Sequence, residues 1–239
     1  MHKTTTAKPL LELSITLIVP SIILMKLSGP AYLGSVSALL LALAFPLLWG
    51  VWSLLRERCV NLFAVLGIVG ILLTGGIGLL QLDPQWLAVK EAAIPALIGV
   101  AVLVSTLTPY PVIRSLVYNP ALMNAEKIQA ALEMRGNTAA YERRLLNSGY
   151  LLAGTFFFSA AVNYLLASWL VTSPAGSAAF NAELGRLTLL SYPVIAIPSA
   201  LMLLAILYSL WRSTHAMTGL RLDEVLVSRT PSQRRGKRS

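Results

Sequence analysis

Long uninterrupted apolar stretches limit what this 239-residue chain can fold into. A membrane-spanning α-helix needs about 20 mostly apolar residues. Six stretches qualify, at about residues 10–27, 32–55, 60–82, 92–110, 150–171 and 187–211. Strands of a membrane β-barrel would instead alternate apolar and polar residues in short segments. The sequence therefore predicts an all-α, polytopic transmembrane helical bundle of about six spans.

The shortage of charge points to the same class. Charged residues make up 12% of the chain, hydrophobic residues make up 56%, and the mean hydropathy is +0.71. A soluble domain carries about a quarter charged residues, so this chain has too few to cover a water-exposed surface. This composition excludes most soluble-enzyme interpretations.

The charges that remain are distributed unevenly along the chain, which has a formal net charge of +9. If the N-terminus is cytoplasmic, sixteen of the 19 Lys and Arg residues lie inside, and only Lys26, Lys90 and Arg186 lie outside. Such an excess marks the cytoplasmic side of a membrane protein. We therefore expect both termini in the cytoplasm and a multi-pass location in the cytoplasmic membrane. The basic side then faces anionic lipid headgroups, and the high pI is no evidence for a nucleic-acid partner.

The first span has two interpretations. Its apolar core runs only from Leu13 to Met25, contains Pro20, and follows Lys3 and Lys8. These features allow a cleaved signal peptide as well as a retained membrane helix. The residues around Ser28 suit cleavage poorly, so the retained helix is preferred, and the question stays open.

One longer connection, at about residues 117–149, separates the fourth and fifth spans. Asn124 is a suitable helix N-cap, and Gly136 is a suitable C-cap. An apolar face of Met123, Ile128, Ala131 and Leu132 predicts either an amphipathic cytoplasmic helix at the headgroups or a solvated connector. The whole of residues 1–227 is interpreted as one transmembrane domain, and the basic tail, 228–239, as disordered.

The third span is rich in small residues. A stripe with a spacing of four residues lets a neighbouring helix approach closely. Adjacent glycines also permit local unwinding, on which transporters build substrate sites. Helix packing is the commoner use, and we assign it to Gly70, Thr74, Gly75, Gly76 and Gly78.

Polar residues recur on one face of the fifth span. Thr155, Ser159 and Asn163 are four residues apart and so point the same way from a helix. This polar intramembrane face either lines a path for a solute or forms hydrogen bonds with neighbouring helices. Asn163 is costly to bury without a partner.

The residues needed for catalysis or metal binding are scarce. The sequence has one cysteine, Cys59, and two histidines, His2 and His215, at opposite ends of the chain. It contains no phosphate-binding loop, dinucleotide fingerprint, nucleophile elbow or zinc-protease motif. We therefore predict a non-catalytic protein with no cofactor and no metal.

An ordered set of residues in the third to fifth spans resembles the bacterial intracellular septation protein A family of inner-membrane proteins. The resemblance covers about residues 61–169 and includes a Gly-Gly pair, an acidic loop, a lysine and a Pro-Val-Ile-Arg exit. Its family-like residues are Asp83, Lys90, Ser105, Pro111 and Arg114. The chain also has an extra span, a longer cytoplasmic segment and a basic tail. In these features it resembles an uncharacterised six-span sister group more closely.

Two functions follow as hypotheses. The resemblance implies a role in cell-envelope maintenance or septation through helix-helix contacts, with division or envelope membrane proteins or a second copy of the chain as partners. The alternative is a secondary transporter for a small molecule or an ion. A water-filled cavity inside the bundle would favour transport, and a dry core would favour the scaffold.

Overall fold

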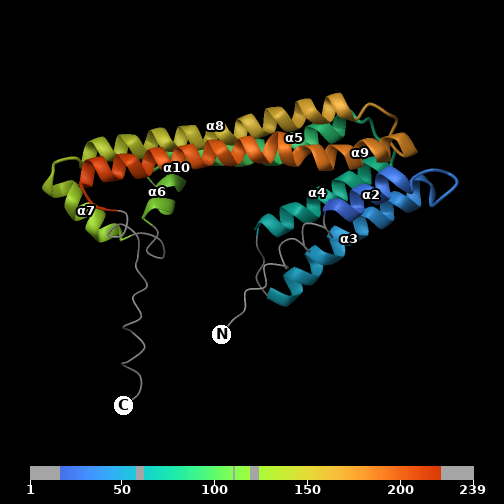
Figure 1. Ribbon diagram of the computed structural model, residues 1–239, viewed down its shortest axis with the longest axis horizontal. Coiled ribbons are helices and arrows are strands. Elements are labelled where there is room, and N and C mark those ends of the chain that lie inside the picture. Colours follow the sequence, from blue (N-terminus) through green and yellow to red (C-terminus); the bar gives the residue numbers. More distant parts are fainter. Residues whose placement is uncertain (1–16, 58–61, 110, 119–123, 222–239) are drawn as a thin grey trace, which may run out of the picture. The chain divides into compact units, whose positions relative to one another are not determined.

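A computed structural model of the chain describes residues 17–57, 62–109, 111–118 and 124–221. Within these ranges every regular element is a helix and no strand occurs (Figure 1). Four helical segments are long and apolar enough to cross a membrane: Gly34–Trp52, Gln85–Thr106, Thr138–Leu170 and Ala178–Thr218. The all-α class and the membrane character predicted from the sequence are therefore confirmed.

The described residues divide into two compact units. Of the described residues, the first unit contains 17–57, 62–96 and 158–199, and the second contains 97–109, 111–118, 124–157 and 200–221. Helices α5 (Gln85–Thr106), α8 (Thr138–Leu170) and α10 (Ile197–Thr218) each contribute one part to each unit.

The first unit also contains four whole helices and one π-helical turn. These are α2 (Val19–Lys26), α3 (Gly34–Glu57), α4 (Leu62–Leu79), α9 (Ala178–Ser191) and η2 (Tyr192–Ala196). Two helices of this unit, α5 and α9, begin where a side chain accepts a hydrogen bond from a backbone N–H of the first turn. Asp83 accepts a hydrogen bond from the backbone N–H of Gln85 at 2.8 Å and so opens α5. Ser177 accepts one from Phe180 at 3.0 Å and caps α9.

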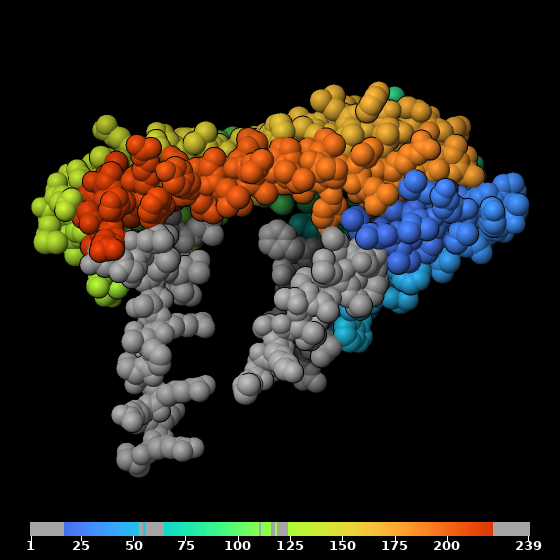
Figure 2. All heavy atoms as spheres, viewed as in Figure 1, coloured from blue at the N-terminus to red at the C-terminus, as the bar shows by residue number. Residues whose placement is uncertain are grey.

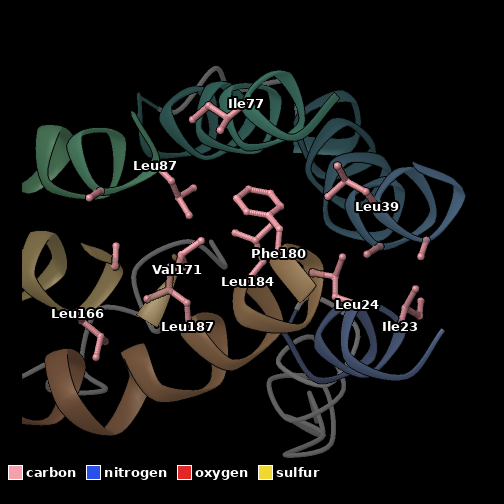
Figure 3. Packing of buried hydrophobic residues seen from close by; sticks show 14 of the residues in the cluster. Ile23, Leu24, Leu39, Ile77, Leu87, Leu166, Val171, Phe180, Leu184 and Leu187 are labelled. Carbon is pink, nitrogen blue, oxygen red and sulfur yellow. The ribbon is translucent and has the colours of Figure 1, made fainter. Parts of the chain in front are cut away.

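Phe180 lies at the centre of the first unit's hydrophobic core. Its side chain is fully buried, and it lies among Leu39 of α3, Ile77 of α4, Leu87 of α5 and Leu184 of its own helix (Figure 3). Burying such a ring contributes about 1.5–3 kcal/mol. Phe180 therefore connects four helices that are distant in the sequence.

Glycine allows the closest helix approaches in this unit. A Cβ on Gly78 would lie 2.5 Å from Leu39, and a Cβ on Gly75 would lie 2.9 Å from Leu43. Gly78, which belongs to the predicted stripe of Gly70, Thr74 and Gly78, and its neighbour Gly75 therefore face α3. Helix α4 is continuous across both, so the adjacent glycines do not unwind it.

The second unit is organised around an antiparallel pair, α8 and α10, which lie side by side in Figure 1. Tyr141 shares a hydrogen bond of 3.0 Å with Thr214. Arg144 donates to Ser213 at 3.1 Å and to Ser209 at 2.5 Å. Two shorter helices, α6 (Val112–Val117) and α7 (Ala125–Met134), complete the unit.

Replacing Tyr141 with phenylalanine should therefore destabilise the second unit by about 1 kcal/mol, because a buried hydrogen bond between α8 and α10 is lost. Thr214 still donates to the carbonyl of Leu210, so no larger effect is expected. Tyr164→Phe, at a 43% exposed position of the same helix, is the matched control. Thermal unfolding in detergent measures both, and equal midpoints for the two variants would contradict the prediction.

The outer side of α10 is apolar and uncovered. Leu201, Leu204 and Tyr208 are each about 60% exposed, and α10 lies open along this unit in Figure 2, in orange to red. Exposed side chains of this kind on a membrane-spanning helix match a lipid environment.

The connection between α5 and α8 differs in part from expectation. Asn124 caps α7 by accepting a hydrogen bond from the backbone N–H of Lys127, and Gly136 has a positive φ of 66°, so both predicted caps are confirmed. However, Ile128, Ala131 and Leu132 are buried, two of them in the core of the second unit. The apolar face of α7 therefore packs on the core of the second unit and not on lipid headgroups, because burial removes its apolar side chains from water. Met123 lies outside the described residues.

Two helix boundaries also differ from the sequence prediction. Helix α5 starts at Gln85, seven residues before the expected 92, so Lys90 and Glu91 lie within a helix and not in a loop. The last apolar segment, Ala178–Thr218, has 41 residues and a length of about 60 Å if fully helical, twice the hydrocarbon thickness. Residues 10–16 of the first expected span and the tail 228–239 lie outside the described residues.

Candidate ligand cavity

A cavity of about 530 Å³ lies within the first unit. Ligand sites in proteins have about this size. Side chains from six elements meet around it, which are α2, α3, α4, α5, α9 and η2. The principal lining residues are Pro20, Leu24, Leu43, Pro46, Leu66, Gly67, Gly70, Ile71, Thr74, Lys90, Glu91, Ile94, Leu184, Leu187, Thr188, Ser191 and Tyr192.

Lys90 is the main polar feature of the cavity. Its ammonium group donates a hydrogen bond of 2.8 Å to the hydroxyl of Thr74 and lies 2.7 Å from a carboxylate oxygen of Glu91. The side chain of Lys90 is 12% exposed and that of Glu91 is 32% exposed. A charged side chain within a membrane-spanning helix is energetically costly and is usually functional.

Thr74 holds this group in place. Its hydroxyl donates to the carbonyl of Gly70 at 3.0 Å, which directs a lone pair toward Lys90. Thr74 and Gly70 belong to the small-residue stripe of α4, and both line the cavity. The small residues of α4 therefore contact two different surfaces. Gly75 and Gly78 pack on α3, whereas Gly70 and Thr74 face the cavity.

The remaining wall is mostly apolar. Leucine and isoleucine side chains from α3, α4, α5 and α9 surround the ion pair, and Thr188 and Ser191 add two hydroxyl groups. Both hydroxyls donate to carbonyls of their own helix, so only their oxygens are left to accept. Because apolar walls lower the local dielectric, the interaction of a ligand with Lys90 or Glu91 is stronger here than in water.

The polar face of α8 does not reach this cavity. Thr155 donates to the carbonyl of Leu151, and Asn163 donates to the carbonyl of Ser159 at 2.8 Å. These side chains therefore bond to their own helix, not to a neighbouring one. Thr155 belongs to the second unit and Asn163 to the first.

The family-like residues fall into two groups. Asp83 and Lys90 belong to the first unit, and Ser105, Pro111 and Arg114 to the second. Ser105 accepts a hydrogen bond of 3.2 Å from the backbone N–H of Val112 and so connects the end of α5 to α6. Pro111 is the N-cap residue of α6.

Arg114 lines a second, smaller cavity of about 330 Å³ together with Ser115, Tyr118 and Gln129. The guanidinium group lies 3.2 Å from a carboxylate oxygen of Glu142 and 5.6 Å from the centre of the Tyr118 ring. Burial, with smaller contributions from Tyr141 and Glu142, raises the pKa of Tyr118 to about 12 against the opposing effect of Arg114. Tyr118 is therefore a neutral hydrogen-bonding group at physiological pH.

Sequence reasoning missed half of the main cavity. The sequence pattern singles out none of Glu91, Thr188, Ser191 and Tyr192. The spacing of the last three of these residues places them on one side of a helix. Within the described residues, no cluster of three His, Cys, Asp or Glu side chains is arranged to hold a metal ion.

Comparison with known proteins gives no relative. No protein-family model, no curated protein and no solved structure matches the chain.

Proposed function

We propose that the protein is a secondary transporter of a small molecule and that the cavity around Lys90 is its binding site. The observation that carries this proposal is an ion pair placed in an apolar cavity of 530 Å³ between helices that are suited to a membrane.

The helices that line the cavity contain the features that allow movement. Pro46 lies inside α3 and lines the cavity, and a proline within a helix removes a hydrogen bond and permits a kink. The π-helical turn Tyr192–Ala196 starts at a lining residue, and such turns often occur at functional sites. Together they support alternating exposure of the site to the two sides of the membrane.

We further propose six spans with both termini in the cytoplasm of a bacterium. The four long apolar segments and the shorter apolar helix Val65–Leu79 support part of this count. The excess of Lys and Arg on the cytoplasmic side supports the orientation. The turn between α4 and α5 is then external, and the Lys90 end of the cavity lies nearer the outside.

The septation or envelope role remains a proposal that rests on the resemblance alone. A deletion strain with normal cell width, septum placement and resistance to envelope stress would contradict this role.

Uptake into proteoliposomes tests the transport proposal. The reconstituted full chain should accumulate at least one member of a panel of labelled small amphipathic solutes faster than protein-free liposomes do. Lys90→Ala should reduce that rate about 10-fold or more, which corresponds to at least one lost charge-assisted hydrogen bond. Asn163→Ala, which lies outside the cavity, should retain it. An absence of saturable uptake, or equal loss in both variants, would contradict the proposal.

A further inference from the structure

We infer that the ligand of the cavity has an apolar body and a zwitterionic head group of the ammonium-carboxylate type, with no net charge. This inference rests on the proposed function and specifies the class of substrate that the same site takes. It follows from the charge balance of the cavity, from the hydrogen-bonding capacity that the ion pair leaves unused, and from the apolar wall.

Among the described residues, the charges that line the cavity balance to zero. Lys90 and Glu91 are the charged residues among those that line it, and they lie 2.7 Å apart. A ligand with a single charge would bring that charge into an apolar cavity whose own charges already compensate each other. Burying an uncompensated charge is strongly unfavourable, so the site discriminates against simple anions and simple cations.

The ion pair nevertheless leaves one N–H donor on Lys90 and one carboxylate oxygen on Glu91 available to a ligand. The ammonium group of Lys90 has three N–H donors, and in the described part of the chain Thr74 and Glu91 occupy two of them. The carboxylate of Glu91 receives Lys90 on Oε1, which leaves Oε2 for a ligand. A carboxylate on the ligand suits the remaining N–H of Lys90, and an ammonium group suits Oε2 of Glu91.

A zwitterion satisfies both positions at once without adding net charge. Each new contact is a charge-assisted hydrogen bond, which is about twice as strong as a neutral one. Thr188 and Ser191 contribute only acceptor oxygens because their hydroxyl hydrogens are already donated. The leucine and isoleucine side chains of the wall then enclose the apolar body of the ligand.

Three probes with the same aromatic body separate the charge classes. These are phenylalanine, 3-phenylpropanoate and 2-phenylethylamine, which are a zwitterion, an anion and a cation. Binding of each labelled probe to the full chain in dodecyl maltoside is measured at equilibrium. We expect phenylalanine to bind about 10-fold or more tightly than either ion, since it makes one more charge-assisted hydrogen bond than they do.

Two substitutions should change this order in opposite directions. Lys90→Met leaves a lone carboxylate, so 2-phenylethylamine should become the tightest of the three probes. Glu91→Gln leaves a lone ammonium group, so 3-phenylpropanoate should become the tightest. Glu91→Gln retains the side-chain shape and an oxygen for Lys90, so it decides the question even if Lys90→Met does not fold. Asp83→Asn, an exposed acid outside the cavity, is the control and should retain the wild-type order.

The outcomes separate this inference from the function on which it rests. Saturable binding in which an ion equals phenylalanine, or in which Glu91→Gln retains the wild-type order, overturns the zwitterion inference and leaves the transporter proposal standing. If the three probes show no saturable binding and no amphipathic solute of the uptake panel is transported, both are overturned. The predicted order with its reversal in the variants establishes the substrate class.

Discussion

Gly70→Phe should abolish ligand binding while the protein stays folded. Gly70 lines the cavity, and a Cβ at this position would meet only Ile94, at an ordinary contact distance of 4.0 Å. A phenyl ring therefore has room to enter the cavity and occupies the space that a ligand needs. We expect affinity to fall about 100-fold or more, which corresponds to about 2.7 kcal/mol.

The matched control lies on the same helix. Gly76 has no neighbour within 4 Å of a Cβ and does not line the cavity, so Gly76→Phe adds the same ring to α4 without blocking the site. Binding isotherms and thermal unfolding are measured for both variants. If Gly70→Phe bound as tightly as Gly76→Phe at equal stability, the cavity would not be the binding site.

Gly185→Val should strongly destabilise the first unit. A Cβ on Gly185 would lie 2.8 Å from the backbone oxygen of Ser21 and 2.7 Å from the side chain of Met25. A backbone atom cannot rotate away, so α2 and α9 must separate. Overpacking of this kind costs about 1–3 kcal/mol, and we expect the upper end of that range because two helices move.

The separation should also weaken binding, since Leu24 of α2 and Leu184 of α9 both line the cavity. Gly154→Val is the control, because Gly154 of α8 has nothing within 4 Å of a Cβ and carries the same change in helix propensity. Thermal unfolding in detergent compares the two variants. A loss of stability in Gly154→Val as large as in Gly185→Val would show that the α2–α9 approach is not the cause.

A buried amide close to this contact holds the α2–α3 turn. Asn181 of α9 is fully buried and donates hydrogen bonds to Ser28 at 3.1 Å and to the carbonyl of Ser35 at 2.7 Å. Its side-chain oxygen has no hydrogen-bond partner in the described part of the chain. The same α2–α9 interface thus combines close packing with buried polar contacts.

The sequence allowed the class of the fold to be predicted because continuous apolar runs are local signals. The start of a helix is harder to predict where its first turns contain charged side chains. The hydropathy pattern excluded Lys90 and Glu91 from the fourth span, whereas the Asp83 cap begins the helix at Gln85. The caps of α7 at Asn124 and Gly136 were predictable because their chemistry is confined to neighbouring residues.

The cavity was not predictable in the same way. It requires α2 and α9, which are separated by more than 150 residues, to meet beside α4 and α5. Apolar burial is not directional, so hydrophobic patterns do not specify which helices become neighbours. Lys90 was selected from the resemblance, but its partner Glu91 and the opposite wall with Thr188 and Ser191 emerge only from the tertiary structure.

Access of water to the cavity tests the central claim most directly. In a Cys59→Ser background, single cysteines are placed at Ser191 in the cavity, at the uncovered apolar position Leu204 and at the exposed position Thr172. A small, charged, water-soluble thiol reagent reacts with thiolates that water reaches. The account predicts modification at positions 191 and 172, protection of position 191 by bound ligand, and none at 204. Modification at 172 alone would mean a dry core and would contradict a binding site for a solute.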